Sequence, residues 1–92
     1  MIKSAFDKRT ARFLEGKSVP EFRAFESQAK RRIAILNEAS CIQDLMNLPS
    51  NRIEALGGNR KGQYSIRVND KWRICFTFQE GDAYDVEIVD YH

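Results

Sequence analysis

Histidine, cysteine and proline are scarce in this 92-residue chain, which contains one His, two Cys and two Pro. Cys41 and Cys75 form no Cys-x-x-Cys or Cys/His spacing, so we expect no zinc site. One disulfide is possible, but Cys75 lies within a strand pattern and is interpreted as a reduced, small apolar residue. No segment has the apolar length of a membrane span or a signal peptide. We therefore expect a cytoplasmic protein that has no metal or cofactor.

The composition is that of a small folded domain with modest net charge. The chain is 42% hydrophobic and has ten aromatic residues, which excludes a disordered tail, and its length predicts a single domain, residues 1–92. The formal charge is only +2. Residues 51–73 contain six basic and two acidic side chains, whereas residues 80–90 contain five acidic and no basic ones. This segregation is compatible with a local anion-binding surface, although ordinary surface charge is the more common explanation of such runs.

The N-terminal region predicts a brief edge strand followed by a helix. Residues 1–6 are short and mixed in character, as in an edge strand. Asp7 is the expected cap of a helix that runs to about Glu15 and is ended by Gly16.

Two capping boxes predict further helices. Residues 18–21 read Ser-Val-Pro-Glu, with Pro in the first turn, and predict a helix that extends to about Asn37. Residues 40–43 read Ser-Cys-Ile-Gln and predict a short helical turn that ends before Pro49. The longer helix has one apolar stripe with steps of three and four, formed by Phe22, Phe25, Ala29, Ile33 and Leu36.

From Tyr64 onward, apolar and polar residues alternate with a period of two. The runs 64–68, 72–78 and 84–89 are separated by turn-forming residues, which predicts an antiparallel meander with one buried face. Together with the helices, this pattern predicts an α+β domain. We expect a small antiparallel sheet of three to five strands with two main helices packed on one face.

The alternation also predicts the register of the strands, because directly opposed residues share a face. The first hairpin then has a three-residue loop, 69–71, and pairs Arg67 with Arg73. The second hairpin loops through residues 80–82 and pairs Phe76 with Val86, Ile74 with Ile88, and Arg73 with Val89. Opposed arginines repel each other unless an anion lies nearby, and Glu87 or a bound phosphate would serve. The expected uncovered face carries Ser65, Arg67, Arg73, Cys75, Glu87, Val89 and Tyr91.

The chain ends in Asp90-Tyr91-His92, three side chains suited to acid–base chemistry. Cleavage of RNA without a metal requires a base for the 2′-hydroxyl proton, an acid for the 5′-oxygen and cations on the phosphate. His92 titrates near neutrality, Asp90 can act as base or orient His92, and Tyr91 can donate a proton or stack on a nucleotide. Strict alternation places only Tyr91 on the uncovered face. A lone terminal histidine is also often an ordinary surface residue.

The stretch Gly58–Phe76 reads GNRKGQYSIRVNDKWRICF and resembles the signature region of HigB-type toxins, in the RelE/ParE superfamily. Residues 86–92 and 1–4 resemble the same family, and the resemblance covers the whole chain. It implies a sheet backed by helices and a RelE-like, metal-independent endoribonuclease that cuts mRNA in the ribosomal A site. The implied partners are the ribosome with its mRNA and a helix-turn-helix, HigA-like antitoxin. Operator DNA would be reached only through the antitoxin, and no membrane is involved.

The resemblance also assigns roles to individual residues. The family's C-terminal Asp-Tyr-His falls on Asp90, Tyr91 and His92, and its arginine after the strand Trp falls on Arg73. These residues are the expected catalytic set, together with Glu54. The residues expected to bind RNA phosphates are Arg60, Lys61 and Arg67.

One segment departs from the family pattern. Some members have a His, and a Lys three residues later, just before the Gly/Arg loop, where this chain has Glu54 and Gly57. The departure removes one candidate acid/base residue and one phosphate contact. Glu54 is therefore either a replacement base or a solvated surface residue, and we expect weaker toxicity.

Two other functions are compatible with the sequence. A ParE-like toxin would inhibit DNA gyrase without nuclease chemistry, which leaves the C-terminal Asp-Tyr-His unexplained. An inert relative would fit the absence of a His at position 54. A free sequence-specific DNA-binding protein is not expected, because the basic residues lie on strands and loops without a helix-turn-helix pattern.

Overall fold

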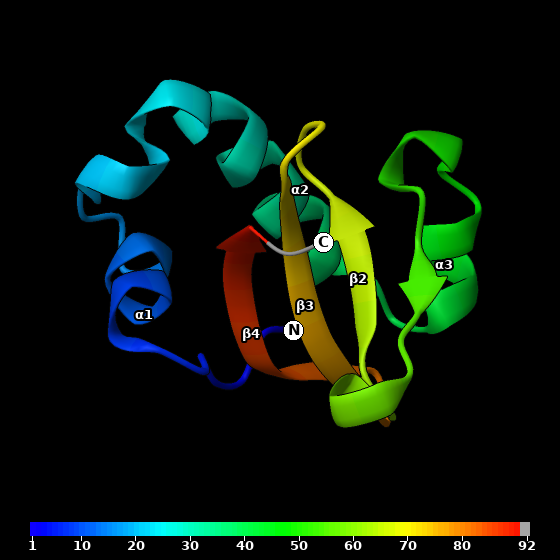
Figure 1. Ribbon diagram of the computed structural model, residues 1–92. Coiled ribbons are helices and arrows are strands. Elements are labelled where there is room, and N and C mark those ends of the chain that lie inside the picture. Colours follow the sequence, from blue (N-terminus) through cyan, green and yellow to red (C-terminus); the bar gives the residue numbers. More distant parts are fainter. Residues whose placement is uncertain (91–92) are drawn as a thin grey trace.

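A computed structural model describes residues 1–90 of the chain. Four strands form one antiparallel sheet in the order β1-β2-β3-β4 (Figure 1). They are β1 (Glu54–Ala55), β2 (Tyr64–Arg67), β3 (Trp72–Gln79) and β4 (Asp82–Asp90). The predicted antiparallel meander is therefore confirmed.

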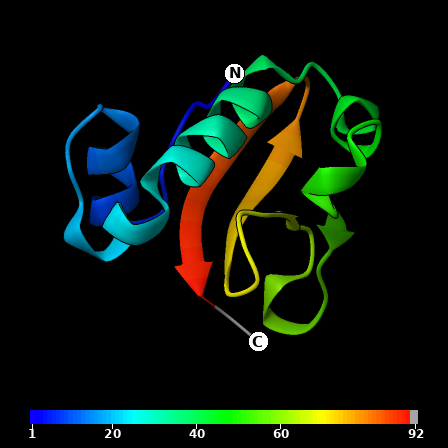
Figure 2. The same ribbon diagram turned by 90° about the horizontal axis from the view of Figure 1, so that it is seen from above.

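The helices lie on one face and at the two edges of this sheet. The long helix α2 (Glu26–Glu38) packs against one face, whereas α1 (Lys8–Leu14) lies beside β4 and α3 (Ile42–Met46) beside β1 (Figures 1 and 2). Three short 3₁₀ segments connect these elements: η1 (Pro20–Phe25), η2 (Pro49–Asn51) and η3 (Gly58–Arg60). Within residues 1–90, no helix is both long and apolar enough to cross a membrane. The expected α+β architecture is confirmed.

The predicted start of the first helix is correct. The carboxylate of Asp7 accepts a hydrogen bond from the Thr10 amide at 2.9 Å, as an N-cap residue does. Gly16 follows the last turn with φ +86°, a left-handed conformation that ends the helix without steric cost.

Both predicted capping boxes are wrong in detail. The segment that begins at Pro20 is a 3₁₀ helix without a side-chain cap, and the α-helix starts only at Glu26, because Phe25 leaves helical geometry at φ −128°, ψ 26°. In the second box, the Ser40 amide and hydroxyl both donate to the Asp44 carboxylate at 2.9 Å. These bonds lower the pKa of Asp44 and replace the predicted Ser40–Gln43 contact.

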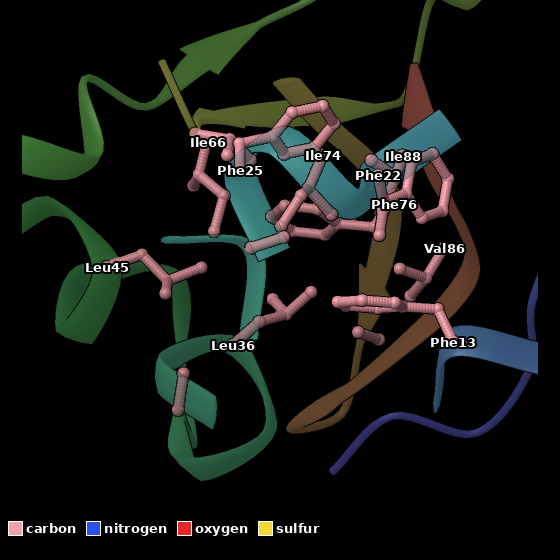
Figure 3. Packing of buried hydrophobic residues seen from close by; sticks show 14 of the residues in the cluster. Phe13, Phe22, Phe25, Leu36, Leu45, Ile66, Ile74, Phe76, Val86 and Ile88 are labelled. Atoms are coloured by element: carbon pink, nitrogen blue, oxygen red, sulfur yellow. The ribbon is translucent and has the colours of Figure 1, made fainter. Parts of the chain in front are cut away.

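The core lies between α2, η1 and the inner face of the sheet (Figure 3). Phe22 is fully buried and packs edge-on against Phe13 and Trp72, with ring centroids 5.4 and 5.6 Å apart. The predicted apolar stripe therefore faces the sheet even though it spans two helical segments. The sheet contributes fully buried residues to this core, namely Ile66, Ile74, Phe76, Val86 and Ile88.

The first hairpin has the predicted register, whereas the second keeps the predicted register only where Arg73 pairs with Val89 and Ile74 with Ile88. Arg67 is paired with Arg73. The β3–β4 loop, however, contains only Glu80 and Gly81, both with positive φ, as in a type I′ turn. The extra residue is taken up by a bulge opposite Cys75–Thr77, where Asp85 has φ +52°. The predicted pairing of Phe76 with Val86 falls in this bulge and is wrong.

The N-terminal segment covers the outer edge of β4. It forms two isolated parallel bridges, Ile2 with Ala83 and Ala5 with Val86, rather than a continuous strand. Backbone hydrogen bonds of 2.8–3.0 Å join the two segments. The expected edge strand is therefore present only as these bridges.

Candidate functional site on the open face of the sheet

The guanidinium of Arg73 is held from several sides on the face of the sheet opposite α2. Its Nε donates to Ser65 Oγ at 2.8 Å, and its Nη2 donates to the Arg52 carbonyl at 2.6 Å. The Glu54 carboxylate lies 3.6 Å from the same Nη2. The Arg73 side chain is only 15% exposed, whereas that of Glu54 is 59% exposed. A fixed cation therefore lies beside an accessible carboxylate.

The carbonyl that holds Arg73 depends on an unusual backbone conformation. Arg52 adopts φ 42°, ψ 53° at the end of η2, in the left-handed region that L-residues rarely occupy. The preceding Asn51 is fully buried, donates to the Leu45 carbonyl at 3.0 Å and accepts from Arg32 Nη1 at 2.8 Å. These bonds fix the η2 turn and so place the Arg52 carbonyl. No sequence pattern indicated this contact.

Arg67, directly opposite Arg73, forms an ion pair with Asp70 in the hairpin loop. The Asp70 side chain is 98% exposed, so this pair is readily exchanged for another anion. The hypothesis that Glu87 compensates Arg73 is wrong. Glu87 is instead bound to Arg60 Nη1 at 3.1 Å, because η3 brings Arg60 over the open face.

Two small residues of the open face are buried beneath these charged side chains. Ser65 is fully buried and Cys75 is 1% exposed, although both were expected on the uncovered face. Burial raises the pKa of the Cys75 thiol to about 11, and the neighbouring Arg60, Glu87 and Arg73 modify it less. Both cysteines are free, as expected.

Asp90 lies on the opposite face of the sheet from Arg67 and Arg73. Asp90 is paired with Trp72, whose ring packs on Phe25 with centroids 4.9 Å apart, so it belongs to the helix side of the sheet. Its carboxylate lies 3.7 Å from Lys71 Nζ. Tyr91 and His92 lie outside the described residues.

The remaining predicted phosphate ligand, Lys61, is exposed just after η3. The face thus gathers Arg73, Arg67, Arg60 and Glu54, whereas Ser65 and the Arg52 carbonyl were not assigned a role from the sequence. Across residues 1–90 there is no cluster of three or more His, Cys, Asp or Glu side chains suited to a metal ion.

Comparison with known proteins shows the family to which the chain belongs. The family profile of HigB-like toxins, described as "RelE-like toxin of type II toxin-antitoxin system HigB", matches residues 4–92. The chain belongs to the HigB-like toxin family. Toxin HigB-1 of Vibrio cholerae is 42% identical over 60 residues, which are 65% of this chain and 63% of that protein. Endoribonuclease HigB of Proteus vulgaris is 39% identical over 61 residues, 66% of this chain and 65% of that protein. Both matches thus span just under two thirds of the relative.

Solved structures support the fold of this HigB-like chain. The YoeB–YefM complex from Staphylococcus aureus contains a chain with a TM-score of 0.59 and 17% identity, covering 100% of this chain and 98% of that one. A YafQ mutant from E. coli has a TM-score of 0.59 at 12% identity, covering 98% of this chain and 93% of that one. The RelE-like architecture is therefore confirmed.

Proposed function

We propose that this HigB-like toxin is a metal-independent endoribonuclease that cleaves mRNA in the ribosomal A site and so inhibits translation. The observation that carries the proposal is the fixed guanidinium of Arg73 beside the exposed carboxylate of Glu54, 3.6 Å apart on an open surface. The name of the Proteus relative, an endoribonuclease, supports the same chemistry. An open sheet face also accommodates an extended polynucleotide.

In this mechanism Glu54 takes the proton of the RNA 2′-hydroxyl. The 2′-oxygen attacks the adjacent phosphorus, and the bond from phosphorus to the 5′-oxygen breaks, leaving a cyclic phosphate and a 5′-hydroxyl. Arg73 stabilises the negative charge that builds on the phosphate oxygens. Its Nε and Nη2 are engaged, and among residues 1–90 no contact engages Nη1, so Nη1 is the atom that we assign to the phosphate.

The protonation of Glu54 and the charge of Arg73 are coupled in this step. While Glu54 is ionised, it partly compensates the guanidinium 3.6 Å away. Once Glu54 accepts the 2′-hydroxyl proton, that compensation is lost and the full cation faces the phosphate. The electrostatic stabilisation thus strengthens as the transition state forms.

The proton for the departing 5′-oxygen is assigned to the C-terminal residues. His92 is the proposed acid, with Asp90 orienting it and Tyr91 stacking on a nucleotide. Neighbouring phosphates are assigned to the basic side chains around the face, Arg60, Lys61 and Arg67. Arg67 would exchange the exposed Asp70 carboxylate for a phosphate.

The ribosome and an antitoxin are the proposed partners. Because the proposed catalytic residues are few, the ribosome must orient the substrate. Such orientation can lower the activation barrier by several kcal/mol. The purified protein is therefore expected to cleave ribosome-bound mRNA and to leave naked RNA nearly intact. The S. aureus YoeB–YefM structure is a toxin–antitoxin complex, which supports an antitoxin as partner. The antitoxin proposed here is HigA-like, holds this toxin inactive and links it to operator DNA. With these partners, the proposed location of the protein is the cytoplasm.

Primer extension on mRNA from cells that briefly express the protein tests the proposal. Cuts in phase with the reading frame are expected, and Glu54→Gln should reduce them by about 10²–10⁴-fold, as for loss of a general base. Glu38→Gln, an exposed carboxylate at the end of α2, is the matched control. DNA breaks without RNA cuts would instead indicate gyrase inhibition.

A further inference from the structure

Three residues form a row across the open face, on neighbouring strands. Ser65 of β2 is directly opposite Cys75 of β3, which is directly opposite Glu87 of β4. Neighbouring strands are about 4.8 Å apart, so the two ends of the row are separated by roughly 10 Å. Ser65 and Cys75 are 0% and 1% exposed, and the Glu87 side chain is 14% exposed.

Each end of this row binds one arginine. Ser65 Oγ accepts the Nε hydrogen of Arg73 at 2.8 Å, and Glu87 Oε1 accepts from Arg60 Nη1 at 3.1 Å. The two arginines come from different parts of the chain, Arg73 from β3 and Arg60 from η3. Cys75 between them is small, and its thiol is neutral at physiological pH because burial raises the pKa to about 11.

We propose that Ser65 and Glu87 are positioning residues that hold Arg73 and Arg60 at a fixed spacing, so that the two guanidiniums bind consecutive phosphates of one RNA strand. Arg73 takes the phosphate at the cleaved bond and Arg60 takes its neighbour. This assignment rests on the proposed nuclease function. A free arginine side chain samples many rotamers, and buried acceptors that fix it remove that cost before the substrate arrives.

The two ends of the row differ in charge, and this difference fits two separate tasks. The Ser65 hydroxyl is neutral and orients Arg73 without cancelling its charge, as required of a residue that stabilises a transition state. The Glu87 carboxylate partly cancels the charge of Arg60, which suits a residue that binds and releases a substrate phosphate.

Kinetics on ribosome-bound mRNA tests whether Ser65 acts through Arg73. Ser65→Ala should lower the single-turnover cleavage rate by about 10–10²-fold, as expected for a slightly misplaced catalytic group. In an Arg73→Ala background, the same change should have no further effect. Ser65→Thr, which keeps the hydroxyl, should restore most of the rate. Thr77→Val, which removes a hydroxyl that bonds Tyr84, is the matched control.

NMR on the intact protein gives a readout independent of cleavage. The Nε hydrogen of Arg73 should exchange slowly in the parent and faster in Ser65→Ala. Titration with 2′-O-methylated RNA, which is not cleaved, separates the two ends of the row. Ser65→Ala should weaken the binding of both a dinucleotide, which has one phosphate, and a trinucleotide, which has two. Glu87→Ala should lower the affinity only for the trinucleotide, by several-fold, and Glu87→Gln should restore that affinity.

Three outcomes would overturn the positioning proposal. In the first, Ser65→Ala slows cleavage as strongly in the Arg73→Ala background as alone. In the second, Arg73 Nε is released in Ser65→Ala while the oligonucleotide affinity is unchanged. In the third, Glu87→Ala increases the affinity for the trinucleotide, as expected if Glu87 only repelled the phosphates. If the parent cleaves no ribosomal mRNA, the proposed function fails, and the NMR titrations still decide the positioning of the arginines.

Discussion

The substitution Thr10→Val tests how α1 is attached to the sheet. Thr10 is fully buried, and its Oγ1 accepts a hydrogen bond from the amide of Ile88 at 3.1 Å. Valine has nearly the same shape but no acceptor, so the buried Ile88 N–H loses its partner. Such an unsatisfied group costs about 1–3 kcal/mol. A domain of this size loses about 4–8 °C in Tm per kcal/mol, so a mid-range loss lowers Tm by about 8–16 °C.

Thermal unfolding and amide hydrogen exchange measure this effect. Thr10→Ser keeps the acceptor and loses one methyl group, about 0.8 kcal/mol, so it should be the milder change. Exchange of the Ile88 amide should accelerate in Thr10→Val and remain slow in Thr10→Ser. A Thr10→Val protein that is as stable as the parent, with an equally protected Ile88 amide, would refute the attachment of α1 through this bond.

Further predictions concern the open face, the C-terminus and the thiols. Arg73→Ala should abolish cell killing while the chain still folds, and an unfolded Arg73→Ala protein would contradict this. Trp72→Ala should lower the free energy of unfolding in urea by roughly 3–5 kcal/mol through the cavity it leaves. Removal of His92 should eliminate killing and leave antitoxin binding intact, and a fully toxic truncation would show that His92 is not the acid. At neutral pH, iodoacetamide should label the exposed Cys41 and spare Cys75 until the chain unfolds. Because burial raises the pKa of Cys75 from 9.0 to about 11, folding stability should decrease as pH rises through this interval.

The sheet was more predictable than the helix boundaries. Alternation in residues 64–68 and 72–76 fixes which side chains point inward, and a one-residue slip would expose the whole apolar set. The β3–β4 loop escaped prediction because a two-residue turn and a bulge preserve the inward-facing residues almost as well as a three-residue loop. The start of α2 was not predicted because the backbone of Phe25 leaves helical geometry while its side chain stays buried, so the apolar spacing does not show the break.

The site was predictable only where it depends on strand register. The opposition of Arg67 and Arg73 follows from alternation and is confirmed. The partner of Glu87 was mispredicted because Arg60 reaches the face through η3, a connection without a periodic pattern. The Arg52 carbonyl had no signal, since a left-handed arginine is a property of the backbone that tertiary contacts impose.

The N-terminal segment is synthesised first but pairs with β4, which is synthesised late, so this part of the fold can form only near the end of synthesis. The Asp85 amide donates to the Ser4 hydroxyl across 81 residues of sequence, and the Lys3 amide bonds the Ala83 carbonyl. Contacts of such separation form late, so folding should be slow for a domain of this size. Glu87 is synthesised after both arginines, and until β4 is made, β3 has an open edge. A partial chain therefore lacks the Glu87 carboxylate that binds Arg60, and the nascent toxin acquires its complete open face only with β4.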